Sequence, residues 1–403
     1  MHGNLSSTDP TTTGKGSPHV LMLPKWWPNP ADVQLGDFLR KQAIAVSGCT
    51  KVSVLYVHSD PVQNATAYVD VIEKEGLWEA HSHFPANGSA FLAWRKTINL
   101  IRYWKAAGNG FHRVVQERGL PDITHVHILV RPALMALWLK RKFGIPYLLS
   151  EQSSEYLDGT YRGKSFAFKW LNQYLFARSS GVSTVSSWLG DGLVKLGLCR
   201  RFDVVPNVVP GLDRPLPKRG EPGHFLVVAD LVDRTKNVSG VIKAIAQARR
   251  QDPRIHLTII GDGPDRGMLE ALALETGMAD AISFLGRLPN VLVLDHMAQA
   301  GAVIVNSNVE TFSVVTGEAL AQGKPVIATK CGGPTAFITR QNGILIEIGD
   351  NAGLTAAILE MTARSDTYEP QEIRMGVSAR FSPGAVGAEF MTIYQRILHP
   401  RHG

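Results

Sequence analysis

The chain has little of what marks several protein classes. It contains three cysteines in 403 residues, Cys49, Cys199 and Cys331, and they lie far apart with no zinc-ligand spacing. We therefore expect reduced thiols with packing roles, in a reducing compartment. No apolar run approaches the roughly 18 residues of a membrane-spanning helix. The sequence therefore predicts neither a disulfide framework nor a transmembrane anchor.

Two N-terminal signals are also missing. Residues 1–17 are rich in Ser, Thr, Gly and Pro and lack the apolar core of a signal peptide, so we expect a disordered leader on a cytoplasmic protein. The first turn, Pro24-Lys25-Trp26-Trp27-Pro28-Asn29-Pro30, contains no Gly-x-Gly-x-x-Gly. A dinucleotide would need that close backbone approach. No cofactor is expected.

The charge balance favours an anionic partner. Lysine and arginine number 42 against 35 acidic residues, a formal charge of +7. Nucleotides, phospholipid surfaces and nucleic acids would all suit such a protein. The basic residues are dispersed and no known nucleic-acid-binding module is present, so nucleic acid is not expected.

The chain is too long for one hydrophobic core and predicts two α/β domains of similar size. Short apolar strands alternate with helical stretches, which is typical of doubly wound parallel sheets. We expect a leader over 1–17, a first domain over 18–205, a linker over 206–223 and a second domain over 224–382. A terminal helix, Pro383 to Leu398, should lie in 383–403. The predicted strands are 20–23, 51–57, 125–129, 146–150 and 181–185, then 225–228, 256–260, 282–285, 302–305, 326–328 and 343–346.

Two glutamates, Glu310 and Glu318, flank the start of a predicted helix in the second domain. The strand 302–305 precedes them, and the helix should run from Thr316 to Gln322 and end at Gly323. Free amides and the helix dipole make such a terminus a natural diphosphate site. The two carboxylates are suited to accept hydrogen bonds from hydroxyl groups on either side of the phosphates. This is the outline of a nucleotide-sugar site.

This spacing, followed by Ala319 to Thr329, resembles the donor-site signature of the retaining GT-B glycosyltransferases of the family 4 (glycosyl transferases group 1) type. The resemblance implies two Rossmann-like domains facing across a cleft, with the last helix crossing back to the first domain. It assigns Glu310 to the transferred sugar and Glu318 to the ribose. It assigns the diphosphate to backbone amides of the segment after Glu310, namely those of Phe312, Ser313, Val314 and Val315.

The resemblance extends to the loops of the second domain. Lys236 stands where the family places a lysine on the diphosphate. Six residues earlier the family commonly has an arginine, but this chain has Asp230, and Arg234 is the nearest substitute. Four further residues are expected to line the donor, two in a turn and two beside the base: Gly261, Gly263, Gly286 and Arg287. The turn glycines serve either close approach to a ligand or the turn itself.

Acceptor-side residues are expected in the first domain. Gly36 follows the aromatic loop, in which Trp26 and Trp27 either stack on a sugar or cap the core. Gln152 stands where many family members carry a histidine, and glutamine cannot exchange a proton. His127 projects with His125 from one strand face, and we favour packing or acceptor lining over a metal. No metal is expected.

The stretch from Phe91 to Lys105 has helical periodicity. Phe91, Trp94, Ile98, Ile101 and Trp104 fall on one side, with basic residues elsewhere. Such a helix either packs on a sheet or rests on an anionic membrane, where lipid-linked acceptors are found.

The resemblance therefore implies a retaining, metal-independent hexosyltransferase of cell-surface polysaccharide or glycolipid synthesis. The donor would be a UDP- or GDP-sugar and the acceptor a glycan or a lipid-linked glycan. The departing phosphate oxygen would itself accept the acceptor's proton, while Lys236 and the helix terminus stabilise the diphosphate. Two alternatives remain, a sugar-nucleotide epimerase of the same architecture and a binding protein that has lost catalysis. The departures at Asp230 and Gln152 support the latter.

Overall fold

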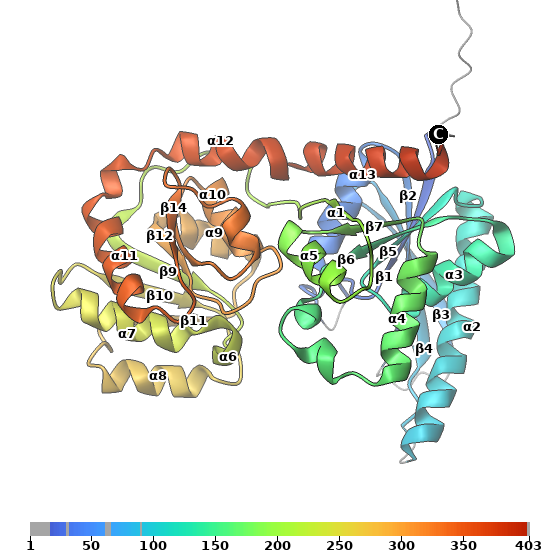
Figure 1. Cartoon of the computed structure of the whole chain (residues 1–403), viewed down its shortest axis with the longest axis horizontal. Helices are drawn as coiled ribbons and strands as arrows, with labels where there is room; N and C mark the ends of the chain where they lie inside the picture. Colours follow the sequence, from blue (N-terminus) through green and yellow to red (C-terminus); the bar gives the residue numbers. More distant parts are fainter. Residues whose placement is uncertain (1–16, 30–31, 61–65, 89–90, 401–403) are drawn as a thin grey trace, which may run out of the picture.

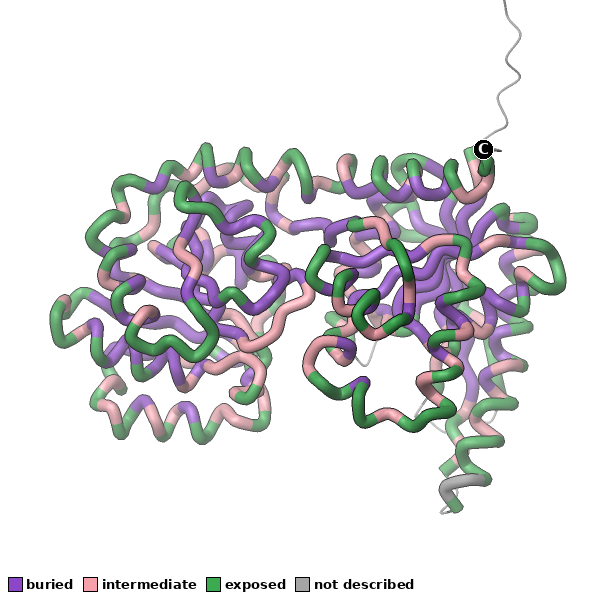
Figure 2. The backbone as a smooth tube through the Cα atoms, in the orientation of Figure 1, coloured by how far each residue is buried: buried purple, intermediate pink, exposed green. Residues whose placement is uncertain are grey.

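The computed structural model describes residues 17–29, 32–60, 66–88 and 91–400. It consists of two Rossmann-like α/β domains that lie side by side (Figure 1). The predicted leader falls outside the described residues except for Ser17. The fold-class prediction is confirmed, and the buried strands form the interior of each domain (Figure 2).

The first domain contains an eight-stranded sheet in the order β3-β4-β2-β1-β5-β6-β7-β8, parallel except where β3 pairs with β4. Its strands are β1 His19–Pro24, β2 Lys51–Asp60, β3 Tyr68–Lys74, β4 Leu77–Pro85, β5 Ile123–His127, β6 Tyr147–Glu151, β7 Gly181–Thr184 and β8 Asp203–Val204. Its helices are α1 Asp37–Ser47, α2 Leu92–Arg118, α3 Arg131–Phe143, α4 Phe166–Arg178 and α5 Ser187–Lys195, with short 3₁₀ turns at Ser154–Tyr156 and Thr160–Gly163.

The sequence did not predict strands β3 and β4. In β4 the buried positions include Glu79, His81 and His83, so the strand shows no apolar run. β3 is mostly exposed at the sheet edge. Strand β5 ends at His127 and not at Leu129, because Ile128 adopts a left-handed backbone conformation with φ of 64°.

The second domain contains a six-stranded, fully parallel sheet in the order β11-β10-β9-β12-β13-β14. Its strands are β9 Glu221–Val228, β10 His256–Ile260, β11 Ile282–Gly286, β12 Ala300–Val305, β13 Val326–Thr329 and β14 Gly343–Ile346. Its helices are α6 Asp233–Lys236, α7 Val238–Arg249, α8 Arg266–Glu275, α9 Asn290–Gln299, α10 Val314–Ala321, α11 Asn351–Ala363 and α12 Pro370–Phe381, with 3₁₀ turns at Gly333–Ala336 and Ser365–Thr367. β9 begins inside the range predicted as a linker.

The last two helices run along both domains (Figure 1). α13, Pro383–Leu398, buries Val386, Phe390 and Ile393 in a core cluster that it shares with β1 and α1. The Tyr394 hydroxyl is 2.7 Å from Nδ1 of His125 on β5. The C-terminal helix thus returns to the first domain and joins the two halves.

No helix in the described part of the chain combines the length and the apolar composition needed to cross a membrane.

Candidate functional site

The carboxyl ends of β9 and β12 bring Lys236 and Glu310 together, although they are 74 positions apart in sequence. The Lys236 ammonium lies 2.6 Å from Oε1 of Glu310, and Ser307 donates a hydrogen bond of 2.7 Å to the same oxygen. Lys236 and Glu310 are only partly exposed, with 26% and 15% of their side chains accessible. The site therefore contains a partly desolvated ion pair, whose cation lies beyond the carboxyl end of β9.

The backbone fixes this pair from both sides. The Glu310 amide donates to the carbonyl of Cys331, and the Gly333 amide donates to the carbonyl of Glu310. Asn308 donates from its amide to the carbonyl of Thr235 and from its side chain to that of Arg234. The loop that carries Lys236 is therefore tied to the loop that carries Glu310. The Arg234 side chain itself is exposed.

Helix α10 begins two residues earlier than predicted, because Ser313 forms its N-cap. Ser313 has φ of 68°, and its hydroxyl accepts from the Thr316 amide and bonds the Thr316 hydroxyl at 2.8 Å. Val314 and Val315 are then the first two helical residues and are half-buried. Amides at these positions have no intrahelical partner and are free for an anion.

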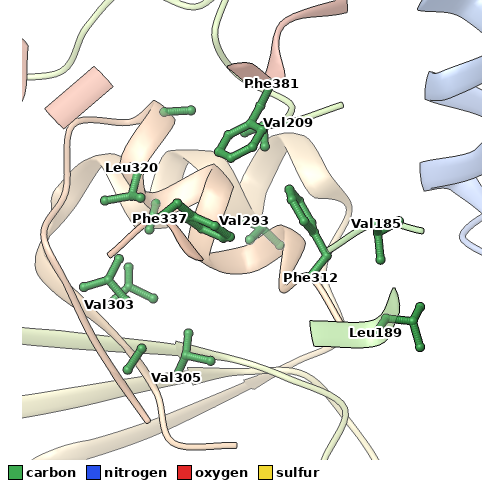
Figure 3. Close-up of a cluster of buried hydrophobic side chains, with 14 of the residues drawn as sticks. Val185, Leu189, Val209, Val293, Val303, Val305, Phe312, Leu320, Phe337 and Phe381 are labelled. Atoms are coloured by element: carbon green, nitrogen blue, oxygen red, sulfur yellow. The ribbon is translucent and has the colours of Figure 1, made fainter. Parts of the chain in front are cut away.

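The side chain of Phe312 is buried, so the predicted donor-binding role of this residue is limited to its backbone amide. It is 3% exposed, and its ring centroid lies 5.4 Å from those of both Phe337 and Phe381. Figure 3 shows these three side chains within the apolar cluster, where Phe381 meets the other two rings edge-on. The backbone of Gly333 also packs directly on that of Phe312. Phe312 therefore anchors the segment and does not contact a donor through its ring.

Glu318 lies one helical turn into α10 and is 4% exposed. Asn290, at the start of α9, donates a hydrogen bond of 2.7 Å to its Oε1. Burial raises the pKa of Glu318 to about 7, against the opposing effect of the Asn290 bond. Lys41 and Asp37 of α1 also influence this pKa, which places the buried carboxyl within reach of the first domain.

Gly36 caps α1 at this interface. Its φ is 69°, and a side-chain Cβ would lie 2.6 Å from the carbonyl oxygen of Trp26, so the close turn requires glycine. Nearby, Gln34 donates to the carbonyl of Leu288 across the domains at 3.4 Å. Ser186 of the first domain likewise donates to the carbonyl of Thr311 at 2.6 Å. The two domains therefore touch around the site.

The turn glycines have a structural explanation. A Cβ on Gly261 would lie 1.8 Å from the carbonyl oxygen of Ala229, and one on Gly263 would lie 2.5 Å from that of Leu231. Both glycines thus pack against the loop that leads to Lys236. Gly286 has φ of 71° and accepts the amide of Gly261 on its carbonyl. The glycines shape the turn and hold the lysine loop in place.

Asp230 does not stand as an isolated negative charge. Arg287, predicted to lie beside the base, places Nη2 3.3 Å from the Asp230 carboxylate. Both side chains are more than half exposed, so the bond contributes little to stability. The Arg287 guanidinium does offset the negative charge of Asp230, which stands at the position where the resembling family commonly has an arginine.

Among the described residues of the first domain with unpartnered buried polar atoms are the two predicted acceptor-side residues His127 and Gln152. His127 is fully buried, neither ring nitrogen has a hydrogen-bond partner among the described residues, and burial lowers its pKa to about 3. Gln152 donates to Oε1 of Gln42 at 3.0 Å, while its own carbonyl oxygen is buried and has no partner in the described part of the chain. Buried polar groups normally have hydrogen-bond partners, so these atoms are candidates for hydrogen bonds with hydroxyl groups of an acceptor. The ring centroids of His125 and His127 lie 3.9 Å apart, but Tyr394 and Ser150 occupy both nitrogens of His125, which favours packing over a metal.

The structure also decides the role of Trp27. It is fully buried, and its Nε1 donates to the buried carboxylate of Glu79 at 2.8 Å. Trp27 therefore caps the core. Trp26 is half-buried, with the Lys25 ammonium 5.1 Å from its ring.

Sequence reasoning missed Ser307 and Asn290 as partners of the two glutamates. Ser307 lies in the turn after β12, three residues before Glu310, and this short spacing was a signal of their proximity. Asn290 reaches Glu318 only through the packing of α9 on α10, for which the sequence offers no local signal.

Two family models match this chain. One, described as Glycosyl transferases group 1, matches residues 211–373, and the other, described as Glycosyl transferase 4-like domain, matches residues 84–208. The lipopolysaccharide core biosynthesis glycosyltransferase LpsD of Rhizobium meliloti (strain 1021) is 28% identical over 212 residues. That match covers 50% of this chain and 60% of the relative, less than two thirds of its length.

Solved structures share the whole architecture. Sucrose-phosphate synthase from Thermosynechococcus elongatus superposes with a TM-score of 0.74 at 18% identity, covering 94% of this chain and 99% of that one. Anabaena HepE, solved in complex with UDP, superposes with a TM-score of 0.70 at 16% identity over the same shares of the two chains. At these identities the likeness establishes the fold.

Proposed function

The chain belongs to the group 1 glycosyl transferases with a GT-B fold, and from that premise we propose that it is a retaining, metal-independent enzyme that uses a UDP-sugar. The proposed acceptor is a glycan or lipid-linked glycan of cell-surface polysaccharide or glycolipid synthesis. LpsD, which is similar over half of this chain, is a lipopolysaccharide core enzyme, and this supports the acceptor class. HepE, with UDP bound in a similar fold, supports the nucleotide.

The observation on which the proposal rests is the Lys236–Glu310 ion pair beside the start of α10. Without a donor, Glu310 is the counterion of Lys236. A diphosphate lying between Lys236 and the Val314 and Val315 amides would meet a cation and free donors that are already in place. Glu310, relieved of the full charge of its partner, would accept a hydroxyl of the transferred sugar. Glu318 would accept the ribose hydroxyls.

The residues then suggest how transfer proceeds. As the glycosidic bond to the diphosphate breaks, negative charge grows on the leaving phosphate oxygen. Lys236 and the helix terminus would stabilise that charge with little reorganisation. The same oxygen would accept the proton of the attacking hydroxyl on one face of the sugar. His127 and Gln152 would orient that hydroxyl only in a state that exposes their unsatisfied polar atoms, which are buried in this structure.

The two rival functions lose support at specific residues. A degenerate binding protein was suggested by Asp230 and Gln152, but Arg287 offsets the charge of Asp230. The Lys236–Glu310 pair is also in place. An epimerase needs acid and base groups around the sugar, and the glutamine at 152 cannot serve as either.

Donor turnover tests this proposal. We expect slow hydrolysis of one UDP-sugar by the purified protein without acceptor, followed by ¹H NMR, with the first sugar released keeping the anomeric configuration of the donor. Hydrolysis of a GDP-sugar instead would reject the nucleotide, and inversion would reject the mechanism. Addition of EDTA should leave the rate unchanged.

We further propose that helix α2 rests on an anionic membrane. Its amino-terminal end extends beyond the rest of the first domain (Figure 1). Phe91, Trp94 and Ile101 are 79%, 62% and 63% exposed. Trp104, which the sequence placed on the same face, instead packs partly buried against the domain core. The exposed face is therefore shorter than predicted and lies toward the start of the helix.

Liposome sedimentation tests this surface. A Trp94→Ala, Ile101→Ala variant should bind phosphatidylglycerol-rich vesicles at least about tenfold more weakly than the wild type, because each large apolar side chain contributes about 1.5–3 kcal/mol when buried. The control variant, Met268→Ala with Leu274→Ala, removes two exposed apolar side chains from α8 of the second domain. Equal loss in both variants, or no loss in either, would contradict a role for α2.

A further inference from the structure

At the amino edge of the second sheet, opposite the site described above, lies a cluster of two histidines and a glutamate. His224 on β9 and His256 on β10 are paired directly across these parallel strands, so they project from the same face. Their rings stack with centroids 4.5 Å apart and planes within 13°. Glu221 is the first residue of β9. One potential ligand atom from each of the three side chains lies within 4.8 Å of the others.

Glu221 reaches the histidines because of the glycine between them. Residues three apart on a regular strand point to opposite faces. Gly223 has φ of 86° and its backbone packs on the carbonyl of Arg254, which interrupts the alternation. This brings the carboxylate to the face that carries both imidazoles.

Each imidazole has one nitrogen held by the protein. His256 places Nδ1 2.9 Å from the carbonyl oxygen of Arg254, which can only accept, so this nitrogen carries the proton and Nε2 carries a lone pair. His224 places Nε2 3.0 Å from the Thr258 hydroxyl, which leaves its Nδ1 for a ligand. Histidines that ligate metals are oriented in this way by a second hydrogen bond.

We propose that Glu221, His224 and His256 form a zinc-binding site. Two imidazoles and one carboxylate are a common zinc donor set with one position left for water. Ligands about 2.0–2.2 Å from Zn²⁺ would sit closer together than the present separations, so the side chains close inward on binding. The positive charge of nearby Arg254 is matched by a bidentate pairing with Asp252. The sequence predicted no metal because these ligands meet only through strand register.

The position of the site separates it from the proposed sugar site. Glu221 and Val228 are the two ends of β9, and at about 3.3 Å per residue they are roughly 23 Å apart. Lys236 and Glu310 lie beyond the Val228 end. Bound Zn²⁺ would link the first residues of β9 and β10, at the edge of the sheet where the chain enters the second domain. It would stabilise that domain without reaching the sugar site, so metal-independent transfer is unaffected.

The test is competition for Zn²⁺ between a chromogenic chelator and the protein prepared without a polyhistidine tag. We expect the wild type and a His112→Gln control, which changes an exposed imidazole on α2, to bind one Zn²⁺ per chain. His224→Gln and His256→Gln should each weaken this binding at least tenfold. In the wild type Zn²⁺ should raise Tm by several degrees, and in the two variants it should not.

Two further measurements separate ligation from misfolding. Thermal unfolding without metal should give similar Tm values for all four proteins, and Glu221→Gln, an exposed change, provides a variant with little structural risk. Co²⁺ should give a visible absorption band in the wild type that His256→Gln lacks. Zinc affinity equal in the wild type, His224→Gln and His256→Gln, or no stoichiometric binding by the wild type, would overturn the proposal.

Discussion

Replacing Lys236 with alanine is expected to lower kcat by about 100- to 1,000-fold, because one well-placed donor to a developing negative charge is worth about 3–4 kcal/mol. The loss falls mainly on kcat, since the charge on the leaving diphosphate is greatest in the transition state. Steady-state kinetics with the preferred UDP-sugar measures it. The effect should be large because Lys236 is held in place by Glu310 and by the loop ties to Asn308 before any donor arrives.

The matched control is Lys243→Ala, which removes an exposed lysine from α7 in the same domain. A kcat for Lys236→Ala within threefold of that control would refute the assigned role. The double variant with Glu310→Ala adds a second check. Because the two side chains share one ion pair, the loss in the double variant should be smaller than the sum of the two single losses, expressed as free energies.

The second large effect concerns Glu318 and pH. Its pKa in the folded protein is about 7, above the ordinary 4.5, so the native state holds this proton more tightly than the unfolded chain does. Between these values the native state binds more protons, and the free energy of unfolding falls as pH rises. The difference amounts to about 3 kcal/mol, which is present below pH 4.5 and lost once pH exceeds about 7.

Chemical denaturation at pH 5 and pH 8 measures this slope. We expect Glu318→Gln to reduce the loss of stability between the two pH values by most of that 3 kcal/mol, since glutamine does not titrate. Glu275→Gln, an exposed change on α8, should keep the wild-type slope. An unchanged slope in Glu318→Gln would mean that this carboxyl is ionised in the native state throughout the range.

If Glu318 binds the ribose as proposed, the same buried carboxyl would link nucleotide binding to proton release. Ribose hydroxyls that donate to Glu318 favour its ionised form and lower its pKa. Near pH 6.5, UDP binding should therefore release a fraction of a proton. Calorimetry in buffers of different ionisation enthalpy detects this release, and Glu318→Gln should lack it.

The sequence was sufficient where structure depends on local pattern. Strands β10 and β14 and helix α13 have the predicted bounds, because each is an apolar segment limited by turn or helix-breaking residues. The grouping of Lys236, Glu310 and the start of α10 was implied by the family resemblance, and it is consistent with their positions at the carboxyl ends of parallel strands. Strand β4 was missed because its buried polar residues are satisfied by tertiary partners, such as Trp27 for Glu79.

Residues whose roles depend on tertiary packing were beyond such reasoning. Phe312 lies in the donor segment, but its ring turns into the core between Phe337 and Phe381, which come from distant elements. The pairing of Arg287 with Asp230 joins two loops 57 positions apart. The Glu221, His224 and His256 cluster likewise depends on the register of β9 and β10 and on the backbone of Gly223. None of these arrangements has a signal in sequence spacing.

The most direct measurement is a calorimetric titration of UDP, and of GDP in parallel, into the wild type and into a Lys236→Ala, Glu318→Ala variant. The proposed donor site predicts one UDP per wild-type chain, weaker or no binding of GDP, and loss of most UDP affinity in the variant. Equal UDP affinity in the two proteins would show that the nucleotide binds elsewhere and would contradict the assignment of the donor site.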